Sequence, residues 1–414
     1  MLAFLEQGLT FFWIGLLVAT RSLTINLLEI PSGAIADTWG RRRSMILSFS
    51  AYIVSFVTLA FAGSVAWFMI AMVLYGIGDS FRTGTHKAMI FEWLRIHGRT
   101  NEKTKVYGTT RSWSKFGSAL SAILAAVFVV ISGNYRSIFL FATIPYVMNI
   151  INFLGYPPEL DGQSDAENDG LDGEATSRQG IIGQSWQTLR TALSESFRNS
   201  SLRRLVFESM SWEGVFHAVK DYIQPVLAAV VVGWIAANQF GEQFDFNEQQ
   251  TTAIAIGAIY TILFLFSGFA SRGAYRFVAW SGDEQQAARR LWLVNGLVYI
   301  ALAWLAWQGV LWGVVLMFVV MHVLQNVWRP ILISRFDEHT QAKKGATVLS
   351  IESGAQRLST LIVAPWLGFW IDHLTVTTDT GQAVAQMGSQ YWPIGVVGAI
   401  AAAGMWFTAV KKSV

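Results

Sequence analysis

The sequence has 414 residues, no cysteine, a formal net charge of +3, 53% hydrophobic residues and only 14% charged ones. Because soluble proteins carry about 25% charged residues, this composition excludes a soluble globular protein, a disordered chain and a disulfide-rich secreted scaffold. The small basic excess fits cytoplasmic loops of a membrane protein better than nucleic-acid binding, so we predict an all-α polytopic membrane protein.

Apolar runs long enough to cross a bilayer, which takes about 20 residues in a helix, follow one another along the whole chain. They are too long for the strands of a membrane barrel, which need about 9–11 residues. Eleven helical spans are therefore predicted, at about 8–36, 44–62, 65–93, 106–131, 135–156, 202–233, 250–279, 288–307, 309–335, 346–371 and 391–410.

Lysine and arginine collect in alternate loops, which predicts that those loops are cytoplasmic. Arg41 to Arg43 and Lys411 to Lys412 belong to this basic set, whereas the opposite loops hold almost no basic residue except Arg136. The N-terminus is therefore predicted outside and the C-terminus inside, in the plasma membrane (the inner membrane of a bacterial cell).

The longest predicted cytoplasmic connection is 157–201. Its first part is rich in glycine and acidic residues, which predicts a flexible linker. Its second part spaces apolar residues at helical intervals, which predicts an amphipathic helix on the inner membrane surface. The linker separates an N-terminal bundle of five spans, 1–156, from a C-terminal bundle of six, 202–414. The apolar residues that predict the amphipathic helix of the linker are Ile182, Trp186, Leu189, Leu193 and Phe197.

The loop after the first span has glycines and an aspartate at fixed spacing before three arginines. It reads Gly33-Ala34-Ile35-Ala36-Asp37-Thr38-Trp39-Gly40-Arg41-Arg42-Arg43. This pattern resembles the signature loop of the major facilitator superfamily. Weaker similarities are Arg329-Pro330 and Gln356-Arg357-Leu358, and the resemblance extends over essentially the whole chain. It implies two pseudo-symmetric helical bundles.

In that family the signature loop latches the two halves on the inner side. The resemblance therefore implies a conformational latch, and a plain basic loop that only sets orientation is the alternative. The latch candidates are Gly33, Asp37, Gly40, Arg41 and Arg42, with Glu352 and Arg357 in the second half.

The loop departs from the family pattern in one respect, because it follows the first span here and the second span in the family. The resemblance therefore implies that the first family helix, which usually lines the substrate cavity, is missing. A start codon assigned too late is the favoured explanation, and a genuine eleven-span form is the alternative.

Ionisable residues inside spans are costly in a bilayer and indicate function by default. The segment 65–93 places Asp79, Arg82 and His86 on one face at i, i+3 and i+7. We predict a substrate- or proton-binding face with Asp79 and Arg82 paired at rest, and a structural ion pair is the alternative. Arg21 lies near the middle of the first span and joins these candidates.

The segment 202–233 carries Glu213, His217 and Asp221 at i, i+4 and i+8, with Lys220 beside them. Such a ladder of carboxylates and imidazole could relay protons, because histidine titrates near neutral pH. The alternative is a satisfied buried network with Lys220 as counter-ion.

The segment 309–335 places His322, Gln325, Asn326 and Arg329 on one face, which predicts a cavity lining. Arg329 lies near the inner end, where it could instead only anchor the helix at the interface. The resemblance agrees with this choice of segments, because 65–93, 202–233 and 309–335 match cavity-lining helices of the family.

These features predict a secondary active transporter that works by alternating access and is coupled to protons. Its partners would be a small-molecule or ion substrate, the coupling proton and the lipid bilayer, without nucleic acid, metal or cofactor, and the chain would be a monomer. A non-transporting receptor or scaffold on a transporter fold is the alternative. An integral membrane enzyme is disfavoured, because no Gly-x-x-x-x-Gly-Lys-Ser/Thr, His-Glu-x-x-His or Gly-x-Ser-x-Gly motif is present.

Overall fold

The computed structural model describes residues 1–99, 103–161, 199–238, 247–338, 345–378 and 388–410, and these residues form helices without any strand. The predicted amphipathic helix of the linker lies outside the described residues. The first half contains α1 (Leu2–Glu6), α2 (Phe11–Trp39), α3 (Arg41–Phe61), α4 (Val65–Ile96), α5 (Lys103–Ser132), α6 (Ser137–Leu154) and the short turn η2 (Pro158–Asp161).

The second half begins with a span made of five consecutive pieces. These are α9 (Ser200–Ser209), the π-helical turn η3 (Met210–Gly214), α10 (Val215–Val219), the 3₁₀ turn η4 (Lys220–Tyr222) and α11 (Ile223–Asn238). The remaining elements are α13 (Glu248–Ser281), α14 (Glu284–Trp307), α15 (Leu311–Glu338), α16 (Gly345–Thr378), η5 (Ser389–Tyr391) and α17 (Trp392–Val410).

Within the described residues, nine helical segments are long and apolar enough to cross a membrane. They coincide with nine of the predicted spans, and the other two, 346–371 and 391–410, fall on α16 and α17. The prediction of an all-α polytopic membrane protein is therefore confirmed.

Contacts divide the chain into two compact units. Unit 1 consists of Met1–Ala19, Ser114–Tyr135 and Glu195–Val414, and unit 2 of Thr20–Trp113 and Arg136–Ser194. The boundary between them crosses α2 and α5, so each of these helices contributes one part to each unit. The predicted domains follow chain order instead, and their boundaries remain a prediction.

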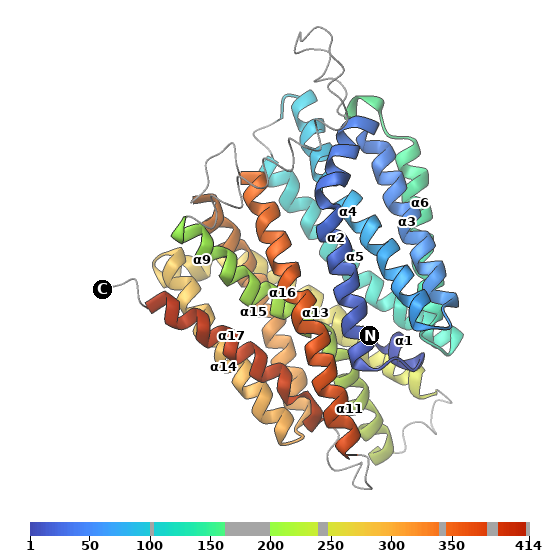
Figure 1. Cartoon of the computed structure of the whole chain (residues 1–414), viewed down its shortest axis with the longest axis vertical. Coiled ribbons are helices and arrows are strands. Elements are labelled where there is room, and N and C mark those ends of the chain that lie inside the picture. Colours follow the sequence, from blue (N-terminus) through green and yellow to red (C-terminus); the bar gives the residue numbers. More distant parts are fainter. Residues whose placement is uncertain (100–102, 162–198, 239–246, 339–344, 379–387, 411–414) are drawn as a thin grey trace. The chain divides into compact units, whose positions relative to one another are not determined.

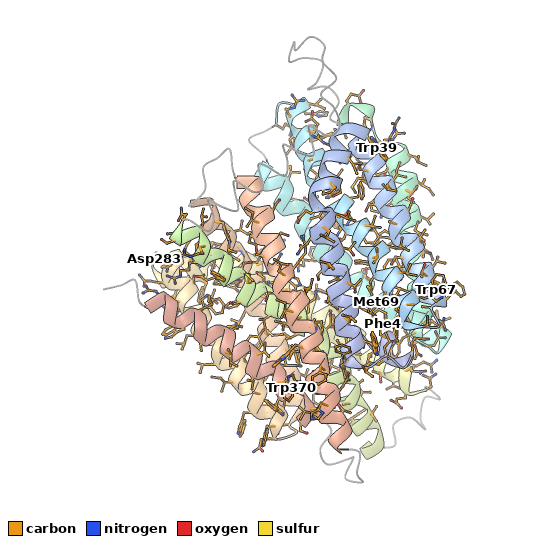
Figure 2. The ribbon with its side chains drawn as sticks, in the orientation of Figure 1. Phe4, Trp39, Trp67, Met69, Asp283 and Trp370 are labelled. Atoms are coloured by element: carbon orange, nitrogen blue, oxygen red, sulfur yellow. The ribbon has the colours of Figure 1, made fainter. Side chains whose placement is uncertain are left out.

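In unit 1, α14 packs along α17 and α13 packs along α15 (Figure 1). Gly395 and Gly398 allow the close contact of α17 with Tyr299 of α14, because a side chain there would collide with that residue. Asp283 and Trp370 mark opposite ends of this unit in Figure 2.

Asp283 begins α14 as its N-cap. Its carboxylate accepts a hydrogen bond from the backbone N–H of Gln286 at 2.7 Å and one from the Gln286 side chain at 2.8 Å. These bonds stabilise the ionised form, so the pKa of Asp283 lies below its usual value.

In unit 2, α3 packs against both α4 and α6. Serine hydroxyls hold α3 to α4: Ser48 donates to the carbonyl of Gly78 at 2.6 Å and Ser55 to that of Ala71 at 2.7 Å. Gly40 joins α2 to α3 with φ at +98°, a left-handed conformation that favours glycine. Trp39 and Trp67 lie at opposite ends of this unit (Figure 2), as expected for aromatic residues near both membrane interfaces.

Candidate functional site

The π-helical turn η3 interrupts the first span of the second half and carries Glu213. The turn lies against α16: a side chain on Gly214 would collide with Ser359, and the Thr360 hydroxyl donates to the Gly214 carbonyl at 3.0 Å. Turns of this kind shift the register of a helix and are frequent at functional sites.

Glu213 is buried, with 2% of its surface exposed, and polar groups surround its carboxylate. Gln325 of α15 donates to Oε2 at 2.6 Å. Arg329 Nη1 lies 3.7 Å from Oε1, and His217 Nε2 lies 4.0 Å from Oε2. The structure thus brings together three of the predicted site residues, Glu213, His217 and Gln325.

Arg329 also binds a second buried carboxylate, that of Glu352 on α16. The guanidinium donates two parallel hydrogen bonds to Glu352, at 2.6 and 3.1 Å, and the Ser209 hydroxyl donates to the same carboxylate. Arg329 therefore lies between two carboxylates that are each at most 2% exposed. We call Ser209, Glu213, Gln325, Arg329 and Glu352 the Glu213 cluster.

Three tryptophans pack beside this cluster. Trp212 stacks on Trp328 with ring centroids 4.4 Å apart and planes 10° apart, and Trp292 contacts both rings edge-on. Trp212 and Trp328 directly precede Glu213 and Arg329 in the sequence. The apolar rings exclude water from one side of the cluster.

The other candidates of the second half lie around His322. Its Nδ1 contacts the Phe318 carbonyl at 2.8 Å, its ring packs edge-on against Phe216, and Asn326 donates to its carbonyl. Lys220 and Asp221 lie on η4 and are half-buried. Glu213, His217 and Asp221 lie in turn on the π, α and 3₁₀ stretches of this span, and the proton ladder remains a prediction.

In unit 2, Asp79 and Arg82 of α4 are paired at 3.0 Å, as predicted for the resting state. Tyr52 of α3 completes the arrangement, because its hydroxyl donates to Asp79 at 2.6 Å and accepts from Arg82 Nε at 3.1 Å. His86 is exposed farther along α4.

Arg21 of α2 also lies in unit 2, with its guanidinium 5.6 Å from the centre of the Tyr75 ring. Tyr75 in turn packs edge-on against Tyr52 at 4.9 Å. Two aromatic rings thus connect Arg21 with the pair formed by Asp79 and Arg82.

The latch candidates separate into two groups. Arg41 lies 3.7 Å from Glu92, and Arg42 donates to the Tyr156 carbonyl at 3.2 Å, both within unit 2. Gly33 lies inside α2, and the Asp37 side chain is outside the described residues. Glu352 belongs to the Glu213 cluster, and Arg357 donates to Ser353 on its own helix at 2.8 Å. Their role as a latch remains a prediction.

Within unit 1, the beginning of α2 is attached to α16. Both oxygens of Asp372 accept backbone N–H groups of α2, from Phe11 at 2.8 Å and Phe12 at 2.7 Å. A side chain on Gly15 would collide with the backbone of Ala364. The two helices therefore touch backbone to backbone.

The end of α5 is attached in the same way to the beginning of α13. Gln250 donates to the Val130 carbonyl at 2.6 Å, and Asn247 donates to that of Gly133 at 3.3 Å. Glu6 accepts the backbone N–H of Tyr135 at 3.1 Å. Burial raises the pKa of Tyr135 to about 12, so its hydroxyl stays protonated and donates to the Gln249 carbonyl at 3.2 Å.

Sequence reasoning missed three of these residues. Arg329 was expected to line the cavity or, alternatively, to anchor the helix at the interface, and its position between two buried carboxylates was not foreseen. Tyr52 lies on a span without charged residues, so no charge pattern pointed to it. Asp372 lies just beyond the predicted span 346–371, and its hydrogen bonds to the beginning of α2 join residues far apart in the chain.

A comparison with known families matches residues 2–364 to the model of the Major Facilitator Superfamily. The chain belongs to this superfamily. The resemblance seen in the signature loop is thereby confirmed, and the family points to a membrane transporter rather than an enzyme.

Relatives of this transporter are distant. It is 26% identical over 128 residues to a probable sulfoacetate transporter, SauU, of Cupriavidus necator, a match that spans 31% of this chain and 29% of that protein's length. Among solved structures, a mutant of the nucleoside transporter NupG superposes with a TM-score of 0.71 at 11% identity, covering 99% of this chain and 92% of that one. A D-xylose-proton symporter superposes with a TM-score of 0.67 at 16% identity, covering 96% and 87%. These structural similarities show the shared fold.

Proposed function

We propose that this protein is a secondary active transporter that moves a small polar solute by alternating access and couples its movement to protons. The observation that carries the proposal is the double attachment of α2 to α16 and of α5 to α13. Transporters of this mechanism rock two helical bundles about a central site, so contacts at one membrane face close while those at the other open.

The attached ends of α2, α16, α5 and α13 all lie next to loops that the charge pattern predicts on the outer side of the membrane. The contacts consist of hydrogen bonds that Asp372 accepts and that Gln250 and Asn247 donate, and of helices that touch at glycines. Such small-residue contacts pack closely without interlocking side chains. These contacts support a state of the transporter that is closed on the outer side of the membrane. Opening of that side would separate α2 from α16 and α5 from α13.

The Glu213 cluster supports proton coupling. With both carboxylates ionised, Glu213, Glu352 and Arg329 carry a net charge of −1 in a buried site. Buried ionisable groups in membrane helices commonly serve proton relays. Because Glu352 holds Arg329 with two hydrogen bonds, we assign the exchangeable proton to Glu213, with His217 as its neighbour on the more exposed side.

Uptake by purified protein in proteoliposomes, with and without a pH gradient, tests this function. The names of the similar proteins give the first solutes to try: sulfoacetate, a nucleoside, for which uridine serves, and D-xylose. We expect at least one solute to accumulate when a gradient is imposed, and a protonophore to abolish the accumulation. Equal uptake without a gradient would contradict the coupling, and no movement of any of the three would contradict transport of these solutes.

Cross-linking tests whether the contact between α5 and α13 opens. The chain has no cysteine, so a pair introduced as Ala126→Cys and Gly257→Cys reacts alone. A Cβ on Gly257 would lie 2.7 Å from that of Ala126, and a small separation gives the roughly 3.5–4.5 Å of a disulfide. We expect oxidation to stop transport and reduction to restore it.

Each single cysteine variant serves as the control and should transport in both redox conditions. Full transport by a completely cross-linked protein would mean that this contact stays closed throughout the cycle.

The remaining predictions complete the proposal. We propose a cytoplasmic C-terminus, which the basic loops support, and a monomer in the plasma membrane. The two bundles 1–156 and 202–414 are the moving bodies, and the basic loop at Arg41 and Arg42 latches the inner side. Accessibility of single introduced cysteines to an impermeant thiol reagent would check the orientation.

A further inference from the structure

Arg21 is a cation in the middle of a membrane span. It lies near the centre of the segment Phe11–Glu29, one of the segments able to cross the bilayer. An arginine at this depth is costly unless protein groups, water or a ligand compensate its charge.

The protein compensates Arg21 only in part. Its guanidinium faces the ring of Tyr75 at 5.6 Å, a weak cation–π contact. Within the part of the chain that the structure describes, its Nε is buried without a hydrogen-bond acceptor, and no ion pair joins it to a carboxylate.

Three other arginines of the membrane spans are paired with carboxylates. Arg329 binds Glu352, Arg335 binds Glu208, and Arg82 binds Asp79. The nearest of these carboxylates in sequence and structure, Asp79, already accepts hydrogen bonds from Arg82 and Tyr52. Asp79 and Arg82 are thus electrically balanced, and Arg21 leaves this part of unit 2 with a charge of +1.

Packing holds Arg21 at the contact between α2 and α4. The Thr20 hydroxyl contacts the Met69 sulfur at 3.2 Å (Figure 2 labels Met69), and a side chain on Gly76 would collide with Thr24. These contacts on both sides of Arg21 fix the backbone from which it extends. Tyr75 adds a phenol ring beside the guanidinium, and Tyr52 packs edge-on against Tyr75.

We propose that the transported solute is a small organic anion and that Arg21 binds its carboxylate or sulfonate group. The planar guanidinium donates two parallel hydrogen bonds to such a group, and the ring of Tyr75 beside it packs against the carbon skeleton of the solute. This inference rests on the proposed transport function, and it names the class of solute.

The test is the thermal stability of the purified full chain with added solutes: sulfoacetate, malate and acetate as anions, and D-xylose as a neutral control. We expect one anion to raise the melting temperature of the natural chain. Arg21→Gln should weaken its binding at least about tenfold, a loss of about 1.4 kcal/mol, and Arg21→Lys should retain part of it.

Arg276→Gln is the matched control. The guanidinium of Arg276 also lies 5.6 Å from a tyrosine ring, that of Tyr275, but on an exposed surface. Its removal should leave anion binding unchanged. A purely structural role of Arg21 would instead lower the melting temperature of ligand-free Arg21→Gln and leave the anion-dependent shift intact.

The proposal is overturned if no anion of the set stabilises the natural chain more than it stabilises Arg21→Gln. Failure of the proposed function gives a different result. Uptake of D-xylose or uridine by both proteins would uphold transport and reject the anion, whereas Arg21-dependent anion binding without uptake would uphold the site and reject transport.

Discussion

Replacement of Glu213 by glutamine is expected to abolish proton-driven accumulation while the protein still folds and inserts. Glutamine has the shape of glutamate and retains an oxygen that can accept from Gln325, which lies 2.6 Å from Glu213. Arg329 retains its two hydrogen bonds to Glu352. The substitution therefore removes the titratable group with little loss of packing.

The expected magnitude follows from the energy of the gradient. One proton moving down one pH unit supplies about 1.4 kcal/mol, which sustains about tenfold accumulation of a solute carried with it. In Glu213→Gln this ratio should fall to about one, while exchange of labelled for unlabelled solute continues. The measurement is uptake and counterflow in the same proteoliposomes.

Glu159→Gln is the control, because Glu159 is an exposed glutamate of η2. If Glu213→Gln accumulates solute as the natural chain does, Glu213 does not carry the coupling proton. If counterflow is lost together with accumulation, Glu213 binds the solute rather than the proton.

Replacement of Arg335 by methionine is expected to destabilise the protein by about 3–5 kcal/mol, the cost of leaving one buried ion without its partner. Arg335 and Glu208 form a doubly hydrogen-bonded pair at 2.6 and 3.2 Å, and both residues are at most 5% exposed. Arg204 also binds Glu208, at 3.0 Å, and compensates part of the loss. Unfolding in detergent, followed by heat or by denaturant titration, measures the change.

The double variant Glu208→Leu/Arg335→Met separates a broken pair from lost packing. Replacing a buried pair by apolar residues of similar volume is often neutral or stabilising, so the double variant should recover most of the stability. Arg276→Met, at an exposed arginine, should change stability by less than about 0.5 kcal/mol. If Arg335→Met is as stable as the natural chain, the ion pair contributes nothing in the folded protein.

The spans could be predicted from the sequence because membrane insertion depends on length and composition, which are local properties. The predicted span 65–93, for example, begins where α4 begins, and α4 continues for three more residues to Ile96. The faces carrying Glu213 and Gln325 were also predictable, because helical spacing fixes which residues share a side.

The connections between those faces were not predictable. Arg329 meets Glu352 because α15 and α16 pack together, and Tyr52 meets Asp79 because hydroxyls of α3 bond to α4. The π turn at Glu213 has a similar origin, because the contact between Gly214 and Ser359 joins residues far apart in the chain. No local pattern contains these long-range contacts.

The stacked pair of Trp212 and Trp328 gives this protein an internal optical signal. Two indoles 4.4 Å apart and nearly parallel couple their electronic transitions, and the coupling depends steeply on their separation and angle. Trp212 is bonded to Glu213 and Trp328 to Arg329, so a shift of either backbone moves a ring. Near-ultraviolet circular dichroism of the unlabelled protein can therefore follow the Glu213 cluster during a pH titration, above the steady background of the other 16 of the chain's 18 tryptophans.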